Sequence, residues 1–247
     1  GGFRSGMISD RRGTTVDSPL FLRKAAMLAI VTVRHNLPNS MIEWRGNRSG
    51  KLVGQLQALA DCFLGFLMDG NAWRRIGRTT MRRDFVGKRV LLTGASSGIG
   101  WYVADYLVRA GAFVVVTGRR QERLDQLRQS FGNPQKRLIA LSGDVADHQH
   151  RLALIATAVD ELGGLDILIN NAGIGAVGQF EGASPERLRR VFEVDFFAAT
   201  ELTRLALPHL HRGRQPAICL VNSVLGHRGV PNKSEYCAAK FALRGWS

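Results

Sequence analysis

The sequence predicts a doubly wound α/β fold, in which a parallel sheet carries helices on both faces. Two observations favour this class. Short apolar runs alternate with helix-like patterns from Lys88 onward, the order expected of right-handed crossovers. The first apolar run breaks into glycines at Gly94, Gly98 and Gly100 just before a helical pattern starts. A buried strand therefore delivers the chain to a tight turn, as in a Rossmann-like domain.

The expected elements follow this alternation along the chain. Strands are predicted at Val90–Thr93, Phe113–Thr117, Leu138–Ser142, Leu165–Asn170 and Ala217–Asn222. Helices are predicted at Ile99–Ala110, Arg119–Phe131, His150–Leu162, Ser184–Leu207 and Glu235–Trp246. The fourth helix begins with a serine cap, a proline in the first turn and an early acid, which is typical of a helix start. Ligands of such a sheet bind where the strand order reverses.

Residues 1–80 do not have the pattern of a separate domain. We expect them to form an irregular or helical, partly disordered extension ahead of the α/β domain at residues 81–247. Leu20–Val33 and Leu52–Met68 have helix-like patterns. The extension has 12 basic and 5 acidic side chains and the remainder 22 and 15, so each part carries +7 of the total +14. We interpret this charge as favouring solubility over nucleic-acid binding.

Composition excludes several other classes. The three cysteines are scattered, which argues against a disulfide framework and favours a reducing cytosol. No apolar run approaches the ~20 residues that a membrane span requires. The pairs His148 with His150 and His209 with His211 are two residues apart, so on a helix they would not share a face, and we expect surface residues rather than metal ligands.

The corner from Thr93 to Gly100 predicts a phosphate-binding site. Glycine allows close approach of a ligand to the backbone, and the following helix begins with unpaired N–H groups and partial positive charge. The spacing Gly-x-x-x-Gly-x-Gly differs from the commoner dinucleotide fingerprint. By itself the corner is therefore equally compatible with an ordinary glycine-rich turn.

Four motifs, taken in order, resemble the short-chain dehydrogenase/reductase family over residues 87–247. They are Thr93-Gly94-Ala95-Ser96-Ser97-Gly98-Ile99-Gly100, Asp144-Val145, Asn170-Asn171-Ala172-Gly173 and Tyr236-Cys237-Ala238-Ala239-Lys240, with Ser223 thirteen residues before the tyrosine. The resemblance implies that the first three motifs, Asn171 to Gly173 in the third, bind a nicotinamide cofactor. It also implies a small-molecule carbonyl or alcohol substrate and a homo-oligomer.

The last motif has a chemistry that can be argued from its residues. Tyr236 and Lys240 are four apart and share one helical face. A nearby ammonium is expected to lower the pKa of the tyrosine, which suits it to act as general acid and base. By resemblance, Lys240 also holds the nicotinamide ribose. Ser223 would donate a hydrogen bond to the same substrate oxygen.

The end of the second strand predicts the choice of cofactor. NAD binding usually requires a carboxylate there, but the chain has Arg119 and Arg120. Arginine pairs with a 2′-phosphate through charge-assisted hydrogen bonds. We therefore expect NADP(H) rather than NAD(H). The alternative is that both arginines are solvated and the preference is mixed.

Two features depart from the family pattern. Many members have asparagine where this chain has Asp195, so we include Asp195 among the candidate catalytic residues. The chain also stops at Ser247, inside the helix of the tyrosine motif, and we expect the sheet to be incomplete on its C-terminal side. The sequence thus predicts an NADP-dependent oxidoreductase, with a catalytically impaired nucleotide-binding or interaction protein as the alternative.

One further group carries no chemistry in this interpretation. Arg187, Arg189 and Arg190 lie close together near the start of the fourth predicted helix. We interpret them as a solvated helix face rather than a nucleic-acid site.

Overall fold

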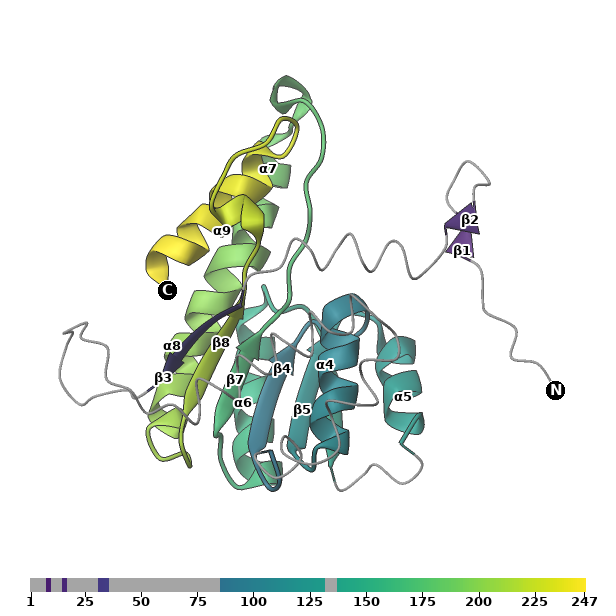
Figure 1. The fold of residues 1–247 in the computed structure, drawn as a ribbon, viewed down its shortest axis with the longest axis vertical. Helices are drawn as coiled ribbons and strands as arrows, with labels where there is room; N and C mark the ends of the chain where they lie inside the picture. The colour runs from purple at the N-terminus through teal and green to yellow at the C-terminus, as the bar shows by residue number, and fades with distance from the viewer. Residues whose placement is uncertain (1–7, 10–14, 17–30, 36–84, 132–136) are drawn as a thin grey trace, which may run out of the picture.

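The computed structural model describes residues 8–9, 15–16, 31–35, 85–131 and 137–247. Its main sheet has the strand order β3-β8-β7-β4-β5-β6 (Figure 1). Five of these strands are parallel, namely β4 (Arg89–Thr93), β5 (Phe113–Gly118), β6 (Leu138–Ser142), β7 (Ile167–Asn170) and β8 (Ala217–Val221). The chain runs outward from β4 to β6 and returns to β7 on the other side of β4. The predicted doubly wound order is confirmed, and it reverses between β4 and β7.

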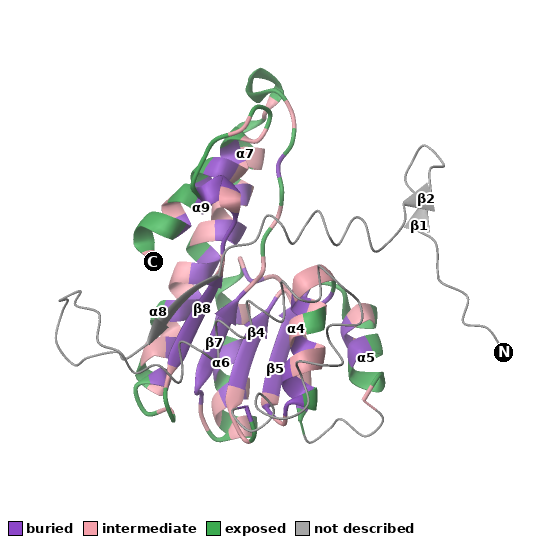
Figure 2. Ribbon diagram, in the orientation of Figure 1, coloured by how far each residue is buried: buried purple, intermediate pink, exposed green. Residues whose placement is uncertain are grey.

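Helices cover both faces of the sheet, as predicted. They are α4 (Gly98–Arg109), α5 (Gln121–Gln129), α6 (His148–Leu162), α7 (Pro185–Phe192), α8 (Ala198–Leu210) and α9 (Ser234–Trp246). Val90 and Leu92 pack into one core with α4 and α5, whereas Leu91 packs into the other with α6 and α8. The central strands are therefore buried on both sides (Figure 2), which explains their continuous apolar runs.

The fourth predicted helix is divided into three parts. A turn of π-helix, η3 (Glu193–Phe197), separates α7 from α8. Single π turns inside helices are frequent at functional sites. Short 3-10 turns are also present at η2 (Phe180–Gly182), before α7, and at η4 (Val224–Gly226), between β8 and α9.

The sixth strand of the sheet corrects one expectation. Helical periodicity predicted a helix at Leu20–Val33, but Val31–His35 forms strand β3, which pairs antiparallel with β8. Three consecutive β-branched residues, Val31 to Val33, favour a strand, and the edge of β8 offers unpaired backbone groups. Among the described N-terminal residues, β1 (Ile8–Ser9) also pairs with β2 (Thr15–Val16) over two residues.

The rest of the predicted N-terminal extension, including Leu52–Met68, lies outside the described residues. The domain boundary near residue 80 stays a prediction. Among the helices of the described part of the chain, none is both long and apolar enough to cross a membrane. A cytosolic location likewise stays a prediction.

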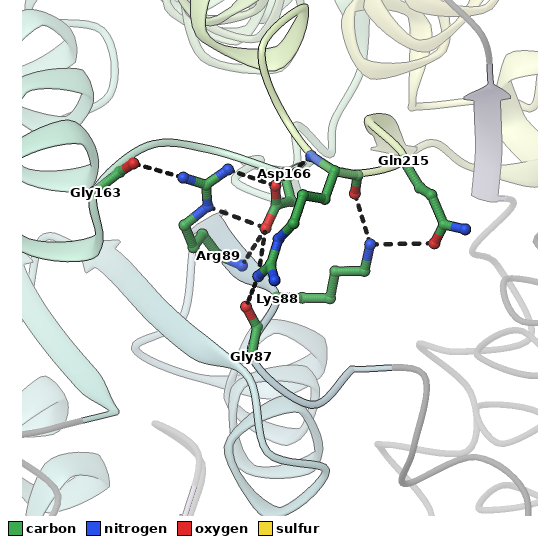
Figure 3. Close-up of polar contacts among 7 residues, drawn as sticks. Gly87, Lys88, Arg89, Gly163, Asp166 and Gln215 are labelled. Carbon is green, nitrogen blue, oxygen red and sulfur yellow. Dashed lines mark hydrogen bonds and ion pairs between the residues drawn. The ribbon is translucent and has the colours of Figure 1, made fainter.

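Asp166 ties together the N-terminal ends of three strands (Figure 3). Its buried carboxylate accepts hydrogen bonds from Arg89 Nη2 at 2.7 Å, from the Arg89 backbone N at 3.0 Å and from the Arg214 backbone N at 2.6 Å. Burial alone would raise the pKa of Asp166, but these hydrogen bonds and the charge of Arg89 outweigh it and lower the pKa below its ordinary value. The N-terminal ends of β4, β7 and β8, which lie opposite the glycine corner, are thereby held together.

We predict that Asp166→Asn lowers the free energy of unfolding by about 3 kcal/mol at pH 7, because it leaves a guanidinium without its buried partner. The pKa of Asp166 is lower in the folded state, so its stabilisation is present above the unfolded pKa of about 3.9 and is lost as the pH falls further. Urea unfolding at several pH values measures both effects, and the difference between the two proteins should narrow in acid.

The matched control is Glu201→Gln, which breaks an exposed ion pair with Arg204 on α8 and should change stability little. Equal losses in the two variants would contradict this role of Asp166.

Candidate active site

The glycine corner joins β4 to α4 at the carboxyl edge of the sheet. Gly94 has φ +73°, and a Cβ there would lie 2.8 Å from the Cα of Ala172. A Cβ at Gly100 would lie 2.2 Å from the carbonyl oxygen of Gly94. Gly98 has φ +56°, but a Cβ there would meet no atom within 4 Å. Two glycines are thus required for packing, whereas the third leaves an open surface at the start of α4.

Thr93 and Asn171 fasten this corner to the loop after β7. The Thr93 hydroxyl accepts hydrogen bonds from the backbone N of Asn171 and of Ala172, each at 3.0 Å. Asn171 Nδ2 donates to the carbonyl oxygens of Thr93 at 2.9 Å and Gly94 at 3.1 Å. Thr93 Oγ1 and Asn171 Nδ2 therefore form hydrogen bonds within the protein, and these bonds support the loop and the corner that line the predicted cofactor site.

The arginines after β5 lie on the other side of the corner. Arg120 Nη2 donates to the carbonyl oxygen of Ser96 at 3.2 Å and lies 3.4 Å from its hydroxyl. Arg119 is exposed, as is Ser97, whose side chain makes no capping hydrogen bond to α4. Ile99, in the first turn of α4, is half-buried. Positive charge and unused donors therefore surround the open surface at Gly98.

Asp144 and Val145 follow β6 on the same edge. One carboxylate oxygen of Asp144 accepts from the Ala146 backbone N at 2.9 Å, and the other pairs with Arg190 of α7. Burial raises the pKa of Asp144, but the Ala146 hydrogen bond and Arg190 outweigh it, so the net shift is downward. Asp144 is thus held as a carboxylate, a hydrogen-bond acceptor at the predicted adenine side.

Lys240 forms an ion pair with Asp195. Lys240 Nζ is 3.2 Å from Asp195 Oδ2 and donates to the Val221 carbonyl at 3.3 Å. It is 5.6 Å from the centroid of the Tyr236 ring. Ser223 is buried, and its hydroxyl accepts from the Leu225 backbone N at 3.1 Å.

Asp195 joins the loop after β7 to α9. Asp195 Oδ1 accepts a hydrogen bond from the Ile174 backbone N at 2.7 Å. A Cβ added at Gly173 would lie 3.1 Å from Asp195 Oδ2, the oxygen that pairs with Lys240. Contacts therefore run without a break from Gly94 through Asn171, Gly173 and Asp195 to Lys240. The structure brings the glycine corner and the Tyr-x-x-x-Lys motif into one site.

The direction of the Tyr236 pKa differs from the expectation. Burial is the largest influence and raises this pKa, a hydrogen bond with Ser223 opposes it, and the charge of Asp195 raises it further. Lys240 is not among the influences on this pKa, and the expected lowering is therefore wrong. Burial also raises the pKa of Asp195, against the opposing charge of Lys240. Spacing along one helix could not show that a carboxylate from another element, Asp195, lies beside Lys240.

Two other expectations change in the structure. Arg187 and Arg190, expected to be solvated, form ion pairs with Glu235 and Asp144. His150 is half-buried and its Nε2 lies 2.7 Å from the Thr117 hydroxyl. The described part of the chain has no group of three His, Cys, Asp or Glu side chains placed to bind a metal.

Helix α9 and the π turn η3 carry exposed aromatic side chains. Phe197 is 47% exposed in η3, and Phe241 and Trp246 are 43% and 44% exposed in α9. The homo-oligomer stays a prediction.

Comparison with known proteins identifies the architecture. Residues 88–247 match the family model for short chain dehydrogenases. The chain is 38% identical over 161 residues to a ketoacyl reductase, HetN, of Nostoc, covering 65% of this chain and 56% of that protein. It is 35% identical over 161 residues to human dehydrogenase/reductase SDR family member 7, covering 64% and 48%.

A solved structure is also similar. A short-chain dehydrogenase from Streptomyces avermitilis superposes with a TM-score of 0.58 at 36% identity, covering 65% of this chain and 58% of that one. The chain spans about half the length of the curated relatives it matches.

We predict that Asp195→Asn lowers the pKa of Tyr236, because the variant removes a negative charge that raises it and keeps an oxygen that can accept from Ile174. NMR titration of ring-labelled tyrosine, assigned with Tyr236→Phe, measures the change. In the control Asp160→Asn, an exposed charge is removed from α6, and the titration should not move. An identical Tyr236 titration in Asp195→Asn and the parent protein would exclude Asp195 from the proton chemistry.

Proposed function

The chain belongs to the short-chain dehydrogenase family, and from that premise we propose that it is an NADP(H)-dependent oxidoreductase that interconverts a carbonyl and an alcohol. One observation carries the proposal. At the carboxyl edge of the sheet, contacts link the glycine corner through Asn171 and the loop after β7 to Asp195 and Lys240, and Lys240 lies one helical turn from Tyr236. That edge lies at the reversal of strand order, where α/β proteins bind ligands.

The residues present fit a dinucleotide. The open surface at Gly98 and the unused N–H groups at the start of α4 suit a diphosphate. Asp144 supplies an acceptor for an adenine amino group, and Lys240 supplies donors for ribose hydroxyls. The nicotinamide ring, when bound, supplies or accepts the hydride.

The protein's own part is the movement of a proton. A raised pKa keeps Tyr236 a neutral phenol at neutral pH, so its hydroxyl can donate a proton to a carbonyl oxygen. Ser223 is placed to hydrogen-bond with the same phenol and would stabilise the phenolate that remains. A neutral phenol is the form that protonates a carbonyl oxygen during reduction, and the name of one relative, a ketoacyl reductase, is consistent with that direction.

The preference for NADP(H) is supported by Arg119 and Arg120. The chain has no carboxylate at the end of β5 or in the two residues that follow it, and Arg120 donates a hydrogen bond to the carbonyl oxygen of Ser96. A 2′-phosphate in this position would accept charge-assisted hydrogen bonds from both guanidinium groups.

A second candidate function rests on the Lys240–Asp195 ion pair. A lysine neutralised by a buried carboxylate holds ribose hydroxyls less strongly and does not assist the phenol. This observation favours a nucleotide-binding protein with impaired catalysis.

One experiment separates the two functions. NADPH binding is measured by fluorescence titration, and turnover is measured by NADPH absorbance with a panel of aldehydes and ketones. For an enzyme, Tyr236→Phe should keep the dissociation constant for NADPH and lower kcat by at least about 100-fold. Binding without turnover in the parent protein would favour the second function, and the absence of NADPH binding would reject both.

The cofactor preference has its own test. Arg119→Ala with Arg120→Ala should raise the Michaelis constant for NADPH about tenfold or more and leave that for NADH nearly unchanged, because only NADPH loses hydrogen bonds to charged groups. Arg128→Ala, at the far end of α5, is the control and should affect neither. Equal effects on the two cofactors would contradict the assignment.

A further inference from the structure

Helix α7 carries three arginines, of which two make long-range ion pairs. Arg187 pairs with Glu235 in the first turn of α9, and Arg190 pairs with Asp144 in the loop after β6. Arg189 is exposed and makes no ion pair among the residues that the structure describes. Arg187 and Arg190 are three positions apart, so they share one side of the helix.

The first ion pair is buried next to the proposed proton donor. The Glu235 side chain is fully buried, and its Oε1 accepts from Arg187 Nε at 2.8 Å and from Nη2 of the same guanidinium. Its Oε2 accepts from the Ser234 hydroxyl at 3.0 Å. Glu235 directly precedes Tyr236, so this pair fixes the backbone from which the tyrosine side chain projects. Paired arginine donors on one carboxylate restrict geometry more than a single contact does.

The second ion pair acts on the nucleotide side of the site. Arg190 bonds one carboxylate oxygen of Asp144, while the other accepts from the Ala146 backbone N at 2.9 Å. The carboxylate is therefore oriented from two directions. Its Arg190 partner is 40% exposed, so we expect a modest energetic effect from this pair alone.

Helix α7 is itself well anchored. Ser184 caps it by accepting a hydrogen bond from the Arg187 backbone N at 3.2 Å, and Pro185 occupies the first turn. The helix continues into the π turn that carries Asp195, which contacts Lys240. Helix α7 and the π turn together thus contact the loop after β6, Glu235 just before the Tyr-x-x-x-Lys motif, and Lys240 at its end.

We propose that Arg187 and Arg190 are positioning residues, by which α7 holds the catalytic first turn of α9 and the adenine-side carboxylate in a fixed relation. The inference deepens the proposed function and rests on it. Arg187 acts on the reaction through Glu235 and Tyr236, and Arg190 acts on cofactor binding through Asp144. The two arginines should therefore affect different steps.

The test for Arg190 is cofactor binding, measured without turnover. Arg190→Ala should raise the dissociation constants for NADPH and for NADH by the same factor, about three- to fivefold, because both cofactors contain adenine. At saturating cofactor, kcat should stay near the parent value. By contrast, the double variant Arg119→Ala with Arg120→Ala should raise the dissociation constant for NADPH alone. A change confined to NADPH, or no change in either cofactor, would overturn the role of Arg190.

The test for Arg187 uses a pair of variants that do not leave a buried charge unpaired. Arg187→Gln with Glu235→Gln removes both charges and keeps hydrogen-bonding groups of similar size. We expect kcat to fall about tenfold, with the dissociation constant for NADPH unchanged, because the tyrosine loses its fixed orientation. Hydrogen exchange of residues 234–240 should become faster in the cofactor-free protein. Arg187→Lys, which keeps the charge, should give values of kcat and of the hydrogen-exchange rate between those of the parent protein and the double variant.

Arg189→Ala is the matched control, with the same residue type on the same helix, and should match the parent protein in every measurement. If the double variant behaves like this control in kcat and in hydrogen exchange, the role of Arg187 is wrong. If the parent protein binds no NADPH, the proposed function fails, and hydrogen exchange still decides whether Arg187 orders the start of α9.

Discussion

The site depends on one steric constraint, the close approach of β4 to the loop after β7. There is no room for a side chain at Gly100 beside the carbonyl oxygen of Gly94, or at Gly94 beside Ala172. Because the two segments pack this closely, Asn171 donates hydrogen bonds to the carbonyl oxygens of Thr93 and Gly94. For the same reason the Thr93 hydroxyl accepts from two backbone N–H groups of the loop. The direction of α4, and hence its exposed N-terminus, follows from that packing.

Two buried aspartates, one near the N-terminal ends of the strands and one near their carboxyl ends, show how hydrogen-bonding partners decide whether the pKa of a buried carboxyl group is raised or lowered. Asp166 accepts several hydrogen bonds from Arg89 and Arg214, and its pKa is lowered despite complete burial. Asp195 is equally buried but has one lysine and one backbone N–H, and its pKa is raised. The first is suited to holding strands together. The second places a carboxyl group with a raised pKa beside Lys240, and its charge raises the pKa of Tyr236, the proposed proton donor.

Helix α7 and the π turn after it connect these effects. The π turn places Asp195 against both Ile174 and Lys240, so the loop after β7 and helix α9 share one carboxylate. Arg187 and Arg190 extend the connection to the start of α9 and to the loop after β6. Two consecutive elements without any recognisable motif therefore contact the loops after β6 and β7 and helix α9.

Local patterns in the sequence determined the α/β class, the glycine corner and the shared face of Tyr236 and Lys240, because each depends on residues that are close together along the chain. Tertiary structure alone decided the pairing of β3 with β8, the partners of the α7 arginines and the direction of the Tyr236 pKa. Glu235 lies 48 residues from Arg187, and Asp144 lies 46 from Arg190. Charged side chains have no periodic signal for a distant partner, and a pKa depends on every charge and on the burial that the fold assembles around it.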